Sequence, residues 1–163
     1  MTTADPYALH GADDFVRLDG ACHELLREFV DWLQQEPVSL HPAEAGALAH
    51  AADRYLREFV VDIMETGPTD ADPSLVRSYL GNWYIIHTLE PTAGEMDRIV
   101  HALDLFYRFL AQRGILDGQA ASRVRAQLQD REFYHGRLQA FWDLTPDTIA
   151  PWRAVDDYRR TAH

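Results

Sequence analysis

The stretch TAGEMDRIVHALDLFYRFLAQRG, residues 92–114, decides the fold class of this 163-residue chain. Its apolar residues recur at the three- and four-residue spacing of one α-helical face: Ile99, Leu103, Phe106 and Leu110. Thr92 and Glu95 have the spacing of a capping box, which satisfies free N–H groups at a helix start. Gly114 is typical of a helix end. The stretch therefore predicts one amphipathic helix between Thr92 and Gly114.

Proline and glycine residues divide the rest of the chain into further helical segments. The predicted helices cover residues 15–36, 42–66, 73–89, 118–129 and 131–144. Pro42 and Pro73 suit the first turn of the helices that they open. No window alternates apolar and polar residues as a half-buried strand would. The sequence predicts an all-α, single-domain helical bundle of five to six helices over residues 15–145. Residues 1–14 are expected to form a flexible arm, and residues 146–163 a short helix or a tail.

Composition predicts a globular protein of the cytoplasm. Hydrophobic residues make up 47% of the chain and charged residues 25%, a balance typical of a packed domain. The single cysteine, Cys22, has no partner for an internal disulfide, and no basic-then-apolar leader opens the sequence. No apolar run reaches the roughly 20 residues that a membrane span needs. The net charge of -11 disfavours nonspecific binding to nucleic acid or to anionic membranes.

The C-terminal third of the chain combines aromatic residues with arginines. Residues 117–163 contain seven arginines and seven acids, so the net acidity lies in the preceding part of the chain. Aromatic and arginine side chains are enriched at the centres of protein interfaces. We therefore expect an interface that comprises Tyr134, Arg137, Phe141, Trp142 and Trp152. The main hypothesis is a non-catalytic interaction module that binds another protein or forms a homodimer.

A metal-dependent helical-bundle enzyme is one alternative. Glu132 and His135 have the Glu-x-x-His spacing found in carboxylate-bridged di-iron bundles, and His87 and His50 from other helices are further candidate ligands. His87 shares the apolar face of its predicted helix, so we expect it to be buried or half-buried. No complete nucleophile, phosphate-loop or metal motif is present. The sequence therefore favours binding over catalysis and predicts no cofactor.

Residues 55–115 suggest a second alternative through a family resemblance. The stretch combines apolar helix positions with one helix end, namely Tyr55-Leu56, Phe59, Val76, Tyr79-Leu80, Leu103, residues 106–110 and Gly114-Ile115. In these residues it resembles the helical core-binding domain at the N-terminus of tyrosine recombinases, the phage-integrase SAM-like domain. The resemblance implies a DNA-associated accessory protein, because basic helices of such domains grip DNA. Acidic residues outnumber arginines in this stretch.

Overall fold

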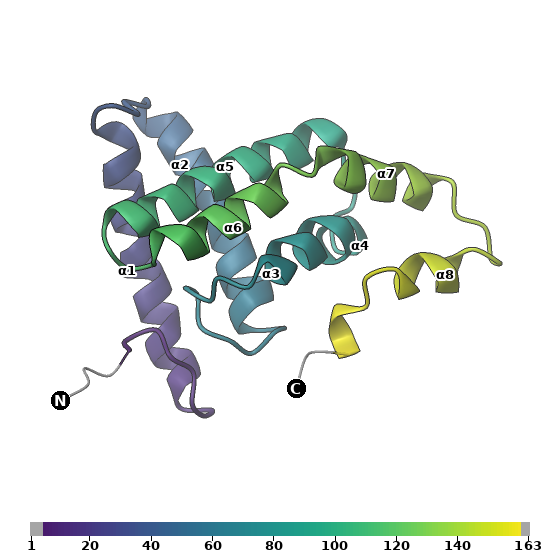
Figure 1. Cartoon of the computed structure of the whole chain (residues 1–163), viewed down its shortest axis with the longest axis horizontal. Coiled ribbons are helices and arrows are strands. Elements are labelled where there is room, and N and C mark those ends of the chain that lie inside the picture. Colours follow the sequence, from purple (N-terminus) through teal and green to yellow (C-terminus); the bar gives the residue numbers. More distant parts are fainter. Residues whose placement is uncertain (1–4, 161–163) are drawn as a thin grey trace.

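The computed structural model describes residues 5–160, which form helices joined by short connections (Figure 1). The two long helices are α1 (Asp14–Gln34) and α5 (Ala93–Gln112), and α5 is followed by α6 (Gly118–Leu128), α7 (Arg131–Trp142) and α8 (Ile149–Ala154). Two other helices change type along their length: α2 (Pro42–Asp53) continues as the π-helix η1 (Arg54–Val61), and α3 (Pro73–Ser78) continues as the π-helix η2 (Tyr79–Trp83) and then α4 (Tyr84–Ile86). A 3-10 turn, η3 (Tyr158–Arg160), comes last.

The all-α prediction is confirmed for the part of the chain that the structure describes. Counted as continuous segments and apart from the 3-10 turn, residues 5–160 form seven helices and no strand. The predicted number of five to six is too low, because the region expected to be a short helix or a tail contains α8. Residues 161–163 of that region lie outside the described residues. None of the described helices is both long and apolar enough to cross a membrane.

Helix starts and ends follow the local signals in the sequence. The Thr92 hydroxyl accepts a hydrogen bond from the Glu95 N–H at 3.1 Å, as its capping position predicts. The Asp72 carboxylate accepts from the Ser74 N–H at 2.9 Å and caps α3 in the same way. Gly114 has φ of 72°, a left-handed conformation that glycine adopts without steric cost. These local bonds satisfy backbone groups that helix termini leave free.

The core is built around α5, which packs against α2 on one side and α6 on the other (Figure 1). Aromatic rings connect α5 to α1: the Phe29 ring meets Phe106 at 5.3 Å and Phe109 at 5.5 Å between centroids. Cys22 is buried on α1, where it acts as a small packing residue. Farther along the chain, α8 runs back beneath α7 in the view of Figure 1, and so returns the chain towards α3 and α4.

The two π-helices lie in contact with each other inside this arrangement. At the end of η1, for example, the Asp62 N–H donates to the Arg57 carbonyl five residues earlier, at 3.1 Å. Aromatic rings of η1 and η2 pack against each other where the two π-helices meet, with 5.5 Å between the centroids of Phe59 and Tyr79. π-Helical turns are rare and occur frequently at functional sites. Apolar periodicity does not reveal them, because the change affects the hydrogen-bond register and leaves the same residue types in place.

The predicted N-terminal arm falls partly outside the described residues, which begin at 5. Arg17 of α1 donates to the backbone carbonyls of Pro6 and Ala8. Tyr7 packs against the core, and its carbonyl approaches Gly67 so closely that a Cβ at Gly67 would lie 2.1 Å from that oxygen. Residues 5–8 are thereby held between α1 and the loop that follows η1.

Candidate functional site

Helices α7 and α8 enclose an apolar groove with a volume of about 700 Å³. Its apolar lining comes from both helices and their connection: Phe133, Ala140, Leu144, Pro151, Trp152 and Val155. Two acidic residues, Glu132 and Asp143, line it as well. We call this feature the α7–α8 groove. Its size falls within the range of pockets that hold small ligands or the side chains of a bound peptide.

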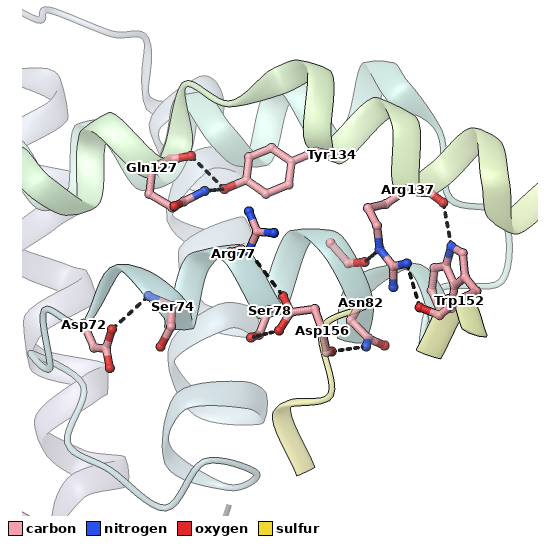
Figure 2. Close-up of polar contacts among 11 residues, drawn as sticks. Asp72, Ser74, Arg77, Ser78, Asn82, Gln127, Tyr134, Arg137, Trp152 and Asp156 are labelled. Carbon is pink, nitrogen blue, oxygen red and sulfur yellow. Dashed lines mark hydrogen bonds and ion pairs between the residues drawn. The ribbon is translucent and has the colours of Figure 1, made fainter. Parts of the chain in front are cut away.

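The groove has a rigid floor because Arg137 ties α7 to α8 and to η2 (Figure 2). Its guanidinium donates to the Gly81 carbonyl at 2.8 Å and to the Trp152 carbonyl at 2.7 Å. The guanidinium also lies 3.8 Å from the centroid of the Trp152 ring, and the indole N–H of Trp152 donates back to the Arg137 carbonyl at 3.0 Å. Burial lowers the pKa of Arg137 to about 10, while nearby Asp156 acts in the opposite direction.

Asp156 fixes the segment after α8 to the α3–η2 helix (Figure 2). The Ser78 hydroxyl donates to the Asp156 carboxylate at 3.0 Å, and the Asn82 amide donates to the Asp156 carbonyl. Arg77 completes the cluster with its Nε 4.0 Å from the same carboxylate. The Arg77 guanidinium also lies 3.7 Å from the centroid of the Phe133 ring, which lines the groove. One polar network therefore positions both walls of the groove.

Exposed apolar side chains accompany the groove. Trp142 is 57% exposed at the end of α7, and Val155 is 59% exposed just after α8. Ile149, at the start of α8, is also exposed. Phe141 is half-buried and connects this surface to the groove, because its ring centroid lies 5.5 Å from that of Trp142 and 5.7 Å from that of Trp152. A contiguous exposed apolar patch is typical of a site that binds another molecule.

The five predicted interface residues have different positions in the structure. Tyr134, Arg137 and Trp152 are buried, and of these three Arg137 and Trp152 line the groove. The Tyr134 hydroxyl donates to the Gln127 carbonyl at 2.8 Å, and burial raises the pKa of Tyr134 to about 12. Phe141 and Trp142 are accessible. Residues that the sequence analysis did not single out, such as Phe133 and Val155, form much of the lining, because only the return of α8 brings them together.

The four candidate metal ligands do not meet. His135 on α7 pairs with Asp97 on α5, with 2.8 Å between Nε2 and Oδ1, whereas Glu132 lines the α7–α8 groove. His50 lines a separate cavity on α2. His87 is exposed, which corrects the expectation of a buried or half-buried side chain. The reason is that α4 ends at Ile86, so His87 leaves the apolar helix face and stacks its ring on Trp83 at 4.5 Å. Within residues 5–160, no three His, Cys, Asp or Glu side chains gather as a metal site.

Comparisons of the chain with known protein families, curated proteins and solved structures give no significant match. The resemblance to integrase core-binding domains therefore stays a prediction from the sequence.

Proposed function

We propose that the protein is a non-catalytic interaction module whose α7–α8 groove binds an apolar segment of another protein. The observation that carries this proposal is the open apolar groove bordered by exposed Val155. Trp142 and Ile149 extend the apolar surface beside it. The burial of such side chains by a partner contributes about 25 cal/mol for each Å² removed from water. The Arg137 contacts hold both walls in place before binding, which reduces the ordering cost of association.

Charge indicates the chemistry of the partner. The charged side chains that line the groove and reach solvent are the acidic Glu132 and Asp143, and the whole chain carries a net charge of -11. The remaining charge in the lining, Arg137, is buried and donates from Nε and Nη1 to two carbonyls. Complementary charge steers association and suppresses wrong partners. We therefore expect an amphipathic partner segment with apolar side chains for the groove and lysine or arginine residues beside them.

The DNA-associated alternative receives less support from the arrangement of charges. Several arginines pair with acids of the same chain, as Arg57 does with Asp19 and Arg125 does with Asp104. Such pairing removes positive charge that a phosphate backbone would need. A cytoplasmic location stays a prediction, based on the single buried cysteine.

The test is a binding selection followed by matched substitutions. A displayed library of helical peptides with a fixed apolar face and lysine or arginine flanks is selected against the protein, and the dissociation constant of the best peptide is measured. Val155→Glu replaces an apolar lining side chain by a carboxylate, which an apolar partner side chain would leave desolvated and unpaired, and it should weaken binding by about tenfold or more. Val16→Glu on α1 is the control, because Val16 is 83% exposed and lies outside the groove lining; it should change binding by less than about twofold.

Two outcomes would decide against the proposal. Selected peptides that bind no better than their scrambled versions would refute it, and so would equal loss of binding in the Val155 and Val16 variants. The remaining possibility is that the partner is a second copy of this chain. Sedimentation of the protein without peptide measures its oligomeric state and tests this possibility. A dimer that Val155→Glu dissociates and Val16→Glu preserves would identify the groove as a homodimer interface.

A further inference from the structure

A second cavity, with a volume of about 580 Å³, lies between α2, the two π-helices and the first turn of α5. Its polar lining includes His50, Arg54, Tyr79, Glu95 and Arg98, and Gly94 contributes backbone. It shares no lining residue with the α7–α8 groove. Arg54 is the first residue of η1 and Tyr79 is the first residue of η2, so both π-helices begin at this cavity. Local changes of helix type of this kind are frequent at functional sites.

Two arginines, Arg54 and Arg98, line the cavity together with one acid, Glu95. Arg54 is held in place by the backbone carbonyl of His87 at 2.7 Å and by the Thr88 hydroxyl at 3.0 Å, and it also pairs with Glu58 at 3.3 Å. Arg98 is exposed and has no ion-pair partner among the residues that the structure describes. One arginine is thus positioned by the fold, and the other is free to close on a bound group.

The first turn of α5 adds backbone donors to the same cavity. Thr92 caps the N–H of Glu95, whereas the N–H groups of Ala93 and Gly94 point out of the helix end without an intrahelical acceptor. An added Cβ at Gly94 would meet no atom within 4 Å, so space is open beside this backbone. The helix dipole places partial positive charge at this end of α5 and favours an anion there.

Tyr79 provides an independent sign that the cavity takes a ligand. Its side chain is 0% exposed, it lines the cavity, and its hydroxyl has no hydrogen-bond partner among the described residues. A buried hydroxyl without a partner costs the protein about 1–3 kcal/mol. Burial also raises the pKa of Tyr79, so the phenol keeps its proton and can donate it to an acceptor oxygen.

From these contacts we infer that the cavity binds the phosphate group of a small phosphate monoester. The phosphate accepts hydrogen bonds from Arg54, Arg98 and the Tyr79 hydroxyl, and it faces the free N–H groups of α5. The number of these hydrogen-bond donors is larger than the two oxygens of a carboxylate can accept. It suits the three terminal oxygens of a phosphate monoester. Glu95 lines the same cavity and its carboxylate repels any anion there, so the two arginines offset one phosphate and no further anionic group. The ligand therefore carries one phosphate together with neutral or cationic groups, and polyphosphates bind less well.

Calorimetric titration with inorganic phosphate and glycerol 3-phosphate, at ionic strength matched with chloride, tests this inference. Saturable binding of one glycerol 3-phosphate per chain is expected, with pyrophosphate binding more weakly. Arg98→Met should weaken binding by about tenfold, as expected for one lost charge-assisted contact. Arg113→Met is the matched control, because Arg113 is an exposed arginine at the opposite end of α5, about 22 Å from Arg98 at 1.5 Å per residue.

Tyr79→Phe gives a second readout that does not depend on the arginines. The free protein should melt at a higher temperature, because the variant lacks the unpartnered hydroxyl, and the further rise in melting temperature caused by phosphate should be smaller than in the unmodified protein. The Val155→Glu variant of the α7–α8 groove should bind phosphate normally, so failure of one proposal leaves the other standing. Absence of saturable binding by either phosphate probe, or equal weakening by the Arg98 and Arg113 variants, would overturn the assignment.

Discussion

Replacement of Arg137 by methionine tests whether this residue holds α8 against the body of the protein. Methionine retains much of the length of the side chain and can still lie against the Trp152 ring, but it cannot donate hydrogen bonds. The change therefore removes the bonds to the Gly81 and Trp152 carbonyls and the cation–π contact, while much of the apolar packing is kept.

The magnitude follows from these contacts. Hydrogen bonds that involve a charged group contribute about 1.5–3 kcal/mol each, so the two bonds together represent roughly 3–6 kcal/mol before any compensation. The lost charge no longer needs to be desolvated, which offsets part of this amount. We expect the free energy of unfolding to fall by about 2–3 kcal/mol. For a chain of this size, that corresponds to a melting temperature lower by about 4–12 °C.

Urea denaturation followed by tryptophan fluorescence and by far-ultraviolet circular dichroism measures this change. Arg131→Met is the matched control, because Arg131 is an exposed arginine in the first turn of the same helix; its cost should stay within about 0.5 kcal/mol. Exchange of α8 amides with deuterium should also accelerate in the Arg137 variant, since the segment loses its attachment. A cost for Arg137→Met no larger than that of the control would refute the view that this contact secures the C-terminal helix.

Two further predictions concern the N-terminal segment and the buried tyrosines. Gly67→Ala should displace residues 5–8, because the new Cβ would fall 2.1 Å from the Tyr7 carbonyl oxygen; faster amide exchange in that segment with an unchanged core is the expected result, and unchanged protection there would contradict it. Tyr55 and Tyr107 are buried with their hydroxyls 3.1 Å apart, and burial raises the pKa of both. Since the unfolded phenols ionise near pH 10, the unfolded state releases these protons first as the pH rises. The free energy of unfolding is therefore unaffected by these groups below about pH 10, and above that pH it falls by about 1.4 kcal/mol per pH unit for each tyrosine. Tyrosinate absorbance and circular dichroism should therefore show these two groups ionising only as helix is lost, and full ionisation of all seven tyrosines in a still-helical protein would rule this out.

Some helix boundaries were predictable because their signals are local. Thr92 and Gly114 each act through their own backbone or a neighbour within three residues, and the structure confirms both. The apolar stripe of α5 was visible for the same reason, since its period depends only on the helix that contains it. The helices predicted over residues 42–66 and 73–89 extend too far, because η1 ends at Val61 and α4 at Ile86.

Burial of the candidate site residues was less predictable, because it depends on segments far apart in the chain. Arg137 stands between Gly136 and Leu138 in the sequence, and only the return of α8 places Trp152 over it. His87 differs in the opposite direction, because it was expected to be buried or half-buried and is exposed. Its exposure follows from the end of α4 one residue earlier. The cavity beside Tyr79 depends on three helices and two changes of hydrogen-bond register. Neither composition nor spacing contains that information.

The attachment of the C-terminal segment also has a consequence for the order of events on the ribosome. Asn82 and the Gly81 carbonyl emerge well before the residues that bind them: Asp156 follows Asn82 by 74 positions, and Arg137 follows Gly81 by 56. At about 5–20 residues per second, Asn82 waits about 4–15 seconds for its partner while the chain is being made. During that interval the polar side of η2 remains hydrated, and the nascent chain presents an unfinished surface to chaperones and proteases. The polar contacts of Ser78 and Asn82 are therefore completed only after Asp156 has been translated.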